Sequence, residues 1–365
     1  MSMVEWKKIG EVTKIIRGNR VTKSDLIDNG LYPVISGGFS PLGFIDRYNR
    51  DENTITIAQY GSAGYVDWQK DKFWANDVCY SVYPLEHLNN KFLYYSLINK
   101  QHDIYLLRTN AVPAHLPLSK LQDVDIPVPN LKEQERIVGV LDTFTSSIEN
   151  LKEQIAQRRK QYEYYRDQLL DLEGKEGVEM KKIQDICVHI CSGGTPSTSH
   201  KEYYEGSIPW LRTQEIDWKD IYDTGLKITD EAIANSSAKI IPANCVIVAM
   251  YGATAAKVAI NRIPLSTNQA CCNLEVDSNK ALYKFVFYWF CKEYVSLKSL
   301  GEGSQNNING KKIKEYLIPV PSIIRQQLIV DILDKFEASI QNLEAQLSQR
   351  EKQYEYYRNK LLTFE

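Results

Sequence analysis

Two stretches of the chain place apolar residues at alternating steps of four and three positions, with one polar interruption in each, at Arg158 and at Arg350. In the first stretch these positions are Ile137, Leu141, Phe144, Ile148, Leu151, Ile155, Arg158, Tyr162, Tyr165, Leu169 and Leu172. In the second they are Ile329, Leu333, Phe336, Ile340, Leu343, Leu347, Arg350, Tyr354, Tyr357, Leu361 and Phe364. This spacing is typical of a heptad repeat, so it predicts two long helices that each bury one stripe. At about 1.5 Å per residue, each stripe is about 50 Å long.

The two predicted helices are copies of one another. When the sequence is compared with itself at a shift of 192 positions, residues 126–173 fall on residues 318–365 without a gap, and roughly 27 of the 48 positions are identical. The heptapeptide KQYEYYR occurs in both copies, at 160–166 and at 352–358. Weaker upstream matches pair YGSAG at Tyr60 with YGATA at Tyr251, and AND at Ala75 with TNQ at Thr267. The whole chain is therefore predicted to be a tandem duplication.

The two helices are expected to pack antiparallel. An IPVP segment precedes each helix, and proline keeps the residue before it extended. Residues 174–177 are too few to lead the chain back along about 50 Å, so the second helix must start at the far end of the first. This arrangement predicts a pseudo-twofold rod with one variable domain at each end.

The variable domains are expected to be of α+β class. We predict them at residues 1–125 and 178–317, each followed by a helical region, at 126–177 and 318–365. Short β-rich runs such as TITIAQY and CVIVAMY alternate with Gly, Asn and Pro turns. Each domain also carries one aromatic helix, NNKFLYYSLINK or ALYKFVFYWFCK.

Composition indicates a globular cytoplasmic protein. A chain of 365 residues that is 43% hydrophobic has the size of about two domains. The seven cysteines form no disulfide framework, the chain does not start like a signal peptide, and no apolar run approaches the roughly 20 residues that span a bilayer. The formal net charge of -2 means that any basic surface must be local, and Lys14, Arg17, Arg20 and Lys23 form the clear basic cluster of the first domain.

No catalytic motif stands out in the sequence. An adenine methyltransferase would need an Asn/Asp-Pro-Pro-aromatic loop and a Gly-rich loop for its methyl donor, and neither occurs. The cysteines at 187, 191, 271 and 272 lack the spacing of a zinc site. The chain is therefore expected to be no enzyme and to bind no metal or cofactor.

From end to end, the chain resembles the specificity subunits of type I restriction-modification systems. The IPVP segments, LDTF and LDKF in the two seams, and KQYEYYR followed by Leu-Leu carry this resemblance. SGGTPS at Ser192, IPWLRTQEI at Ile208 and STNQACCNL at Ser266 also resemble a recognition domain of that family. The first domain departs from it, with RGNRVTK and ISGGFS in place of SGGTPS.

The resemblance implies two α/β target-recognition domains that alternate with two helices paired as an antiparallel coiled coil. It implies that the chain binds a bipartite double-stranded DNA target and two methyltransferase subunits, and in a full complex also restriction subunits. S-adenosylmethionine, and ATP with Mg, are then expected on the partner subunits. Two copies of one docking helix would serve two identical partners, while two divergent domains would recognise two different half-sites.

Candidate contact residues follow from side-chain chemistry. Arginine offers bidentate bonds to guanine or phosphate, and short hydroxyls beside glycines allow close approach to phosphate. For DNA the candidates are Arg17, Arg20, Lys23 and Tyr60 in the first domain and Ser192, Thr195, Arg212, Thr213, Tyr251 and Lys257 in the second. The competing interpretation of these charged and hydroxyl residues is a solvated loop without a ligand. Tyr60 and Tyr251 precede glycine, so for them the competing interpretation is a structural turn.

The candidate partner-binding residues are Tyr164 and Arg166 in the first helix and Tyr356 and Arg358 in the second. Both tyrosines lie between seam positions, so they should point away from the helix pair. Two other functions remain open at this point: a scaffold whose end domains bind protein or glycan, and a fused methyltransferase or nuclease. The first predicts no salt-dependent DNA affinity, and the missing motifs argue against the second.

Overall fold

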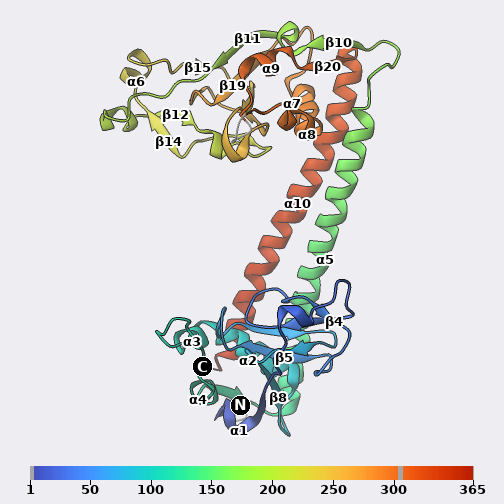
Figure 1. Ribbon diagram of the computed structural model, residues 1–365, viewed down its shortest axis with the longest axis vertical. Coiled ribbons are helices and arrows are strands. Elements are labelled where there is room, and N and C mark those ends of the chain that lie inside the picture. The colour runs from blue at the N-terminus through green and yellow to red at the C-terminus, as the bar shows by residue number, and fades with distance from the viewer. Residues whose placement is uncertain (1–3, 303–306, 365) are drawn as a thin grey trace. The chain divides into compact units, whose positions relative to one another are not determined.

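Each long helix carries one head at its start, and the chain divides into two units (Figure 1). The computed structural model describes residues 4–302 and 307–364. Unit 1 comprises residues 1–153 and 344–365, and unit 2 comprises residues 154–343. Unit 1 contains the first head, residues 5–128, and unit 2 contains the second head, residues 179–320. Each unit also contains a segment of both long helices, α5 (Leu131–Leu169) and α10 (Ile323–Leu362).

The first head is a mixed β structure with short helices between its strands. Its strands are β1 (Glu5–Lys8), β2 (Thr13–Arg17), β3 (Tyr32–Ile35), β4 (Phe44–Ile45), β5 (Thr54–Ala58), β6 (Val66–Gln69), β7 (Trp74–Ala75), β8 (Cys79–Pro84) and β9 (Asp125–Val128). Its helices are α1 (Ile9–Val12), α2 (Asn90–Asn99), α3 (Gln101–Leu106) and α4 (Leu118–Gln122). The strands form an antiparallel sheet β2-β8-β5-β6, a smaller sheet β4-β3-β7, and a two-stranded ribbon of β1 and β9.

The second head repeats this plan with more strands. These are β10 (Glu179–Lys182), β11 (Cys187–Ser192), β12 (Ile208–Leu211), β13 (Asp220–Ile221), β14 (Leu226–Ile228), β15 (Ile240–Ile241), β16 (Val246–Ala249), β17 (Val258–Asn261), β18 (Leu265–Thr267), β19 (Cys271–Val276) and β20 (Leu317–Val320). Its helices are α6 (Asp230–Ala234), α7 (Tyr283–Lys292), α8 (Tyr294–Ser299) and α9 (Gly310–Glu315). The sheets are β11-β19-β16-β17-β13 and β14-β12-β18-β15, and β10 pairs with β20.

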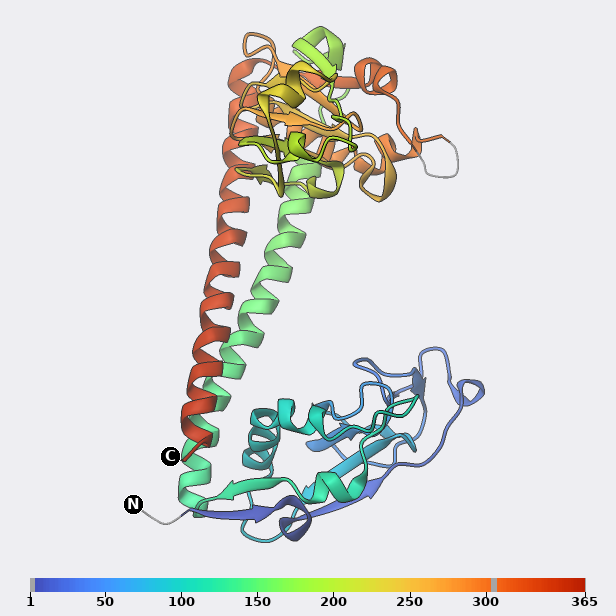
Figure 2. The ribbon, with the colours of Figure 1, turned by 90° about the vertical axis from the view of Figure 1, so that its left-hand side faces the viewer.

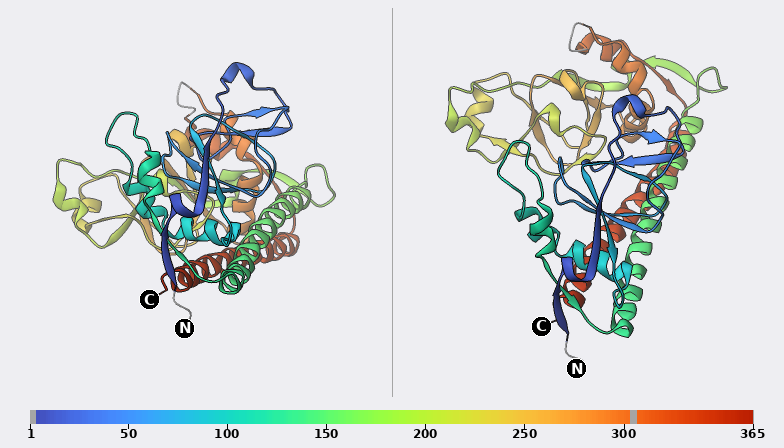
Figure 3. Two further views of the ribbon diagram at one scale, coloured as in Figure 1. Left: turned by 90° about the horizontal axis from the view of Figure 1, so that it is seen from below. Right: turned by 60° about the horizontal axis from the view of Figure 1, so that its bottom comes forward.

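In both heads an aromatic helix lies between the larger sheet and the long helices (Figures 2 and 3). In unit 1, Phe92 of α2 shares a buried core with Ile57 of the sheet and with Ile137 of α5. In unit 2, Phe285 of α7 shares one with Val248 and Leu333. The aromatic helices predicted from the sequence are therefore the layer that joins each head to the helix pair.

The predicted antiparallel pairing of the long helices is confirmed within each unit. In unit 1 the ring of Phe144 on α5 stacks on that of Tyr357 on α10, with centroids 5.3 Å apart. Lys152, further along α5, pairs with Glu351, which lies earlier in α10. Rising residue numbers on one helix thus meet falling numbers on the other.

The same head-to-helix contacts recur in both units. In unit 1, the side-chain oxygen of Gln134 accepts a 2.7 Å bond from the backbone amide of Asn89 at the start of α2. In unit 2, Gln326 does the same for Leu282 at the start of α7, at 2.8 Å. Likewise Tyr95 donates to Asp142 in unit 1, and Tyr288 donates to Asp334 in unit 2. These matched contacts agree with a duplicated α+β chain, and the predicted domain bounds stay a prediction.

Two details of the seam differ from the simple coiled coil that was expected. Tyr162 and Tyr354 occupy seam positions, but they also pack on the cores of the second and first heads, respectively. The polar seam residues Arg158 and Arg350 lie with their guanidinium groups 5.9 Å and 5.6 Å from the ring centroids of Phe336 and Phe144. A planar cation over an aromatic face is favourable, which explains how the seam accommodates an arginine.

Candidate functional site

One edge of the first head gathers loop segments that are distant in sequence. We call residues 17–19, 36–38, 60–61, 75–77 and 115 the first rim. The amide of Asn19 donates to the carbonyl of Ala75 at 2.9 Å, and the amide of Asn76 donates to that of Ile35 at 2.9 Å. The Tyr60 ring stacks on His115 with centroids 5.3 Å apart. Backbone hydrogen bonds therefore hold these segments together, so the side chains at the rim can differ between the two heads without a change of the backbone.

The second head builds the same edge from equivalent segments. We call residues 192–195, 212–214, 251–252, 267–269 and 307 the second rim. The amide of Gly194 donates to Thr267 at 2.9 Å, and that of Asn268 donates to Leu211 at 2.9 Å. The short 3₁₀ turn Thr213–Glu215 lies beside the turn Gly252–Thr254. The two rims therefore share one backbone frame.

Glycine explains why this frame is visible in the sequence. A Cβ atom on Gly18 would lie 2.2 Å from the carbonyl oxygen of Asn76, and one on Gly193 would lie 2.1 Å from that of Thr267. Both approaches are to backbone, so neither position accepts a side chain without a shift of the chain. The structure thus equates RGN at 17–19 with SGG at 192–194, whereas the sequence had offered both RGNRVTK and ISGGFS in place of SGGTPS.

Most of the first-head candidates lie at or beside the first rim. Arg17 ends β2, is exposed, and donates through Nε to the carbonyl of Asp77. Tyr60 belongs to the rim through its stack on His115. Arg20 lies on the loop that follows the rim, Lys23 begins the 3₁₀ turn Lys23–Asp25 after it, and both are exposed. The structure therefore places Arg17 and Tyr60 in the rim, and Arg20 and Lys23 near its border.

The second-head candidates divide into rim residues and one residue that is already paired. Ser192 ends β11 and is exposed, and the Thr195 hydroxyl donates to Gln269. Arg212 and Thr213 follow β12 and are half-buried, and Tyr251 is 41% exposed.

Lys257 lies outside the rim. Its ammonium forms a 2.6 Å ion pair with Asp217 and lies 4.3 Å from the ring centroid of Trp218. Because that charge is compensated within the head, Lys257 presents less positive charge to a ligand than the sequence suggested.

Several rim residues were missed by sequence reasoning. Asn76 accepts a bond from the amide of Val21 at 3.0 Å, so it joins the first rim to the loop that carries Arg20. His115 and Gln269 contact Tyr60 and Thr195 directly. The alignment of AND with TNQ was the available signal for Asn76 and Gln269, whereas no pattern pointed to His115.

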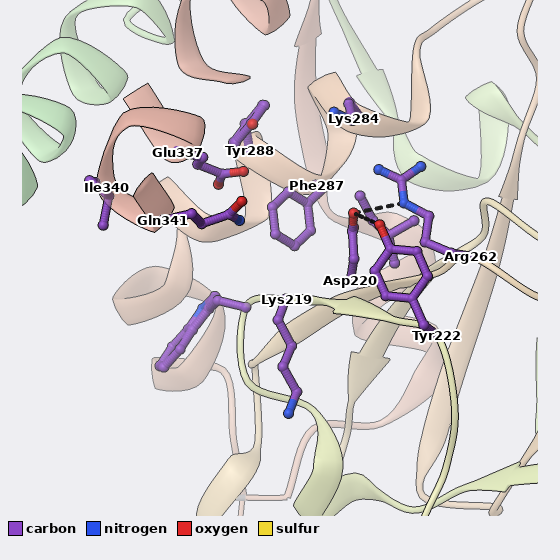
Figure 4. A pocket seen from close by; sticks show the side chains of 12 residues that line it. Lys219, Asp220, Tyr222, Arg262, Lys284, Phe287, Tyr288, Glu337, Ile340 and Gln341 are labelled. Carbon is purple, nitrogen blue, oxygen red and sulfur yellow. Dashed lines mark hydrogen bonds and ion pairs between the residues drawn. The ribbon is translucent and has the colours of Figure 1, made fainter. Parts of the chain in front are cut away.

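The second unit also contains a polar cavity of about 380 Å³ between its head and α10 (Figure 4). Asp220 accepts bonds from Arg262 at 2.8 Å and from Tyr222 at 3.4 Å, and Lys284 pairs with Asp334 at 2.6 Å. Glu337 lines the same cavity and accepts from the hydroxyl of Tyr162 at 3.5 Å.

Burial raises the pKa of Glu337 to about 7. Thr145 stands at the matching position of α5, so this carboxyl belongs to unit 2 alone. The ion pair of Lys284 with Asp334 connects the second head to α10, whereas that of Asp220 with Arg262 lies within the head, and we assign both a structural role.

The long helices present an exposed aromatic surface. Tyr164 and Tyr356 are each 58% exposed, which agrees with their predicted outward direction. Each packs edge-on against the next tyrosine, Tyr165 or Tyr357, with centroids 5.3 Å apart.

Tyr164 and Arg166, both predicted to bind a partner, point to different sides of α5. The guanidinium group of Arg166 lies 5.8 Å from the ring centroid of Tyr162, and its side chain is only 17% exposed. Arg358 has the same position over Tyr354, at 5.4 Å. The reason is the helical period, because residues two apart point about 200° from each other.

Residues 4–302 and 307–364 contain no group of three or more His, Cys, Asp or Glu side chains placed to hold a metal ion. Within the same ranges, no helix is long and apolar enough to cross a membrane.

Comparisons with known proteins agree on one family. Residues 1–158 and 175–351 match the model of the type I restriction modification DNA specificity domain. The chain is 31% identical, over an alignment of 401 residues, to the specificity subunit of the type I restriction enzyme EcoR124I/EcoR124II of Escherichia coli, with 99% of this chain and 94% of that protein covered.

Two solved structures share the fold. The S subunit of a type I restriction-modification system from M. genitalium matches with a TM-score of 0.71 and 20% identity, over 99% of this chain and 97% of that one. A structure that addresses complex assembly and conformational transition of the type I R-M system matches with a TM-score of 0.60 and 14% identity, over 99% and 98% of the two chains.

Proposed function

Because this chain belongs to the family of type I restriction-modification DNA specificity subunits, we propose that its two rims bind the two halves of one bipartite double-stranded DNA target. As a specificity subunit it recognises DNA and is not itself catalytic. The observation that supports DNA binding by the rims is their repeated backbone frame, which carries different side chains in the two heads. One frame with two sets of side chains suits two half-sites of different sequence.

The rim side chains have the chemistry that base and phosphate contacts require. Arg17 and Arg212 supply guanidinium donors for guanine or phosphate, and Ser192, Thr195 and Thr213 supply short hydroxyls next to closely packed backbone. Tyr60 and Tyr251 present rings at the rim. Arg20 and Lys23 contact phosphate at the border of the first rim. Lys257 lies outside the second rim, and its ion pair with Asp217 makes it a weaker contact for phosphate.

The long helices serve a second role in this proposal. Tyr164 and Tyr356 dock two copies of one methyltransferase subunit, since a large exposed ring is a common anchor at protein interfaces. Arg166 and Arg358 support this surface from the head side, by packing on Tyr162 and Tyr354. In a full complex restriction subunits also take part, and S-adenosylmethionine and ATP with Mg bind to the partner subunits. The complex acts in the cytoplasm, where its DNA target is found.

Methylome sequencing of cells that express this chain with its methyltransferase tests the assignment. The expected result is one methylated motif with two defined halves and a fixed gap. Arg17→Ala should relax or abolish the half bound by the first head, and Arg212→Ala should affect the other half, at about 1–3 kcal/mol of binding energy each.

The matched control for these variants is Lys120→Ala, which removes an exposed cation from α4, outside the rims. It should leave the motif unchanged. DNA affinity that does not fall with rising salt would contradict DNA binding and favour a scaffold that binds protein or glycan.

A further inference from the structure

The face of the long helices that points away from each head differs between the two units. In unit 2, α10 packs on its head through Gln326, Val330 and Asp334. The residue two positions before each of these lies about 200° around the helix, and so faces away from the head. These residues are Ile324, Leu328 and Ile332, which are 77%, 58% and 39% exposed. They form an exposed apolar ridge on α10.

The matching ridge of α5 has a different chemistry. In unit 1, α5 packs on its head through Gln134, Val138 and Asp142. The residues two positions earlier are Lys132, Arg136 and Val140. Lys132 and Arg136 are exposed, and Arg136 pairs with Glu133 at 2.6 Å. Two cations thus stand where α10 has isoleucine and leucine.

Each ridge is followed along its helix by a phenylalanine of an equivalent stacked pair of aromatic rings. In unit 2 the next residue at a step of four is Phe336, whose ring stacks on Tyr165 beside the exposed Tyr164. In unit 1 it is Phe144, stacked on Tyr357 beside Tyr356. We define the second docking face as Tyr164 with Ile324, Leu328 and Ile332, and the first docking face as Tyr356 with Lys132, Arg136 and Val140.

We infer that the two docking faces bind two identical methyltransferase subunits with unequal strength, the second face more tightly than the first. This inference rests on the proposed function. Because the two partners are copies of one protein, they bring the same surface to both docking faces. The two faces share a tyrosine and differ in their ridges, so a difference in affinity between them must come from the ridges. An apolar ridge removes hydrocarbon from water when it is covered, whereas Lys132 and Arg136 must lose hydration. Assembly therefore passes through a complex with one methyltransferase, bound at the second face.

The two ridges are also expected to respond differently to salt. Contacts of exposed cations weaken as ionic strength rises, because their charges are screened. Apolar burial is not screened. We therefore expect the two dissociation constants of the wild-type complex to differ at least tenfold, and the difference to grow with salt.

Native mass spectrometry of the full chain reconstituted with its methyltransferase, over dilution and ammonium acetate series, tests this inference. Ile324→Lys with Leu328→Arg gives α10 the ridge of α5, and should weaken the tighter binding step at least tenfold so that both partners leave together. Lys132→Ile with Arg136→Leu makes the opposite exchange, and should strengthen the weaker step until both are retained. Val295→Lys is the control, because Val295 is 75% exposed but lies on α8 of the second head.

The possible outcomes separate the two claims. If two methyltransferases bind and both ridge exchanges leave the two constants within twofold of wild type, the inequality is refuted while the proposed function stands. If the chain binds no methyltransferase, the proposed docking role fails and this inference fails with it. If the chain alone forms dimers that Ile324→Lys with Leu328→Arg abolishes, the apolar ridge is an interface between copies of this chain and the methyltransferase is the wrong occupant.

Discussion

The ring of Phe144 stacks on that of Tyr357 with a centroid separation of 5.3 Å and an interplanar angle of 24°. In the other unit Phe336 and Tyr165 stack at 5.4 Å and 27°. The two pairs are equivalent positions of the repeat, since Phe336 is the copy of Phe144 and Tyr357 is the copy of Tyr165. One aromatic contact thus fixes the antiparallel register in both units.

The stacked pairs should contribute equally to stability. Phe144→Ala and Phe336→Ala each remove a half-buried ring and its stack on a tyrosine, and we expect each to lower the free energy of unfolding by about 2–3 kcal/mol. Denaturant unfolding monitored by circular dichroism measures this. The matched Phe→Leu variants should lose less, and a large loss for only one of the two alanine variants would contradict equal roles.

The buried carboxyl of Glu337 should make stability depend on pH. Burial raises its pKa from an ordinary 4.5 to about 7, so the folded state holds the proton more tightly than the unfolded state. Its stabilising contribution is complete below pH about 4.5 and is lost as the pH rises through about 7. Glu337→Gln should raise the free energy of unfolding at pH 8 by about 1–2 kcal/mol and flatten the profile between pH 5 and 8. Glu355→Gln, at an exposed position of the same helix, should change neither.

The rim glycines should not tolerate a methyl group. Gly18→Ala and Gly193→Ala bring Cβ within 2.2 Å and 2.1 Å of a backbone oxygen, so we expect a loss of more than about 2 kcal/mol in stability and weaker DNA binding by the affected head. Gly139→Ala on α5 meets nothing within 4 Å, and should stabilise the helix by about 0.5–1 kcal/mol. Thermal unfolding and DNA titration of the three variants check this, and a neutral Gly193→Ala would show that the rim can relax.

The exposed tyrosines should control methyltransferase stoichiometry. Tyr164→Ala should release one methyltransferase subunit, and the double variant with Tyr356→Ala should release both, with a cost that could reach about 2 kcal/mol per ring. Native mass spectrometry at low concentration gives the count directly. A double variant that still holds two methyltransferases would remove the tyrosines from the interface.

Helix length should set the gap in the DNA target. Half-sites recognised by two domains of one protein commonly lie about one DNA turn apart, roughly 34–36 Å. Deleting the equivalent heptads 151–157 and 343–349 removes about 10.5 Å from each helix, or about three base pairs. The gap in the methylated motif should shrink by that amount, or methylation should stop. An unchanged motif would refute a role of the helices in spacing.

The helices and the repeat could be predicted because they rest on local periodicity. Seam positions such as Leu141 and Leu333 follow from the heptad, and both are fully buried. The rims were harder, since their segments meet only through tertiary contacts, such as the bond of Asn76 to Ile35. The pairing of Lys257 with Asp217 spans 40 residues and leaves no local pattern.

The chain enters and leaves each head through a two-stranded ribbon. Residues 5–8 pair with 125–128 in the first head, and residues 179–182 pair with 317–320 in the second. A segment whose two ends already lie side by side can be exchanged as a cassette without altering the helices that follow. Natural recombination at the ribbons could therefore create new DNA targets in a single step, while the assembly machinery stays the same. The sequence is consistent with such a history, since the helices have remained alike and the heads have diverged.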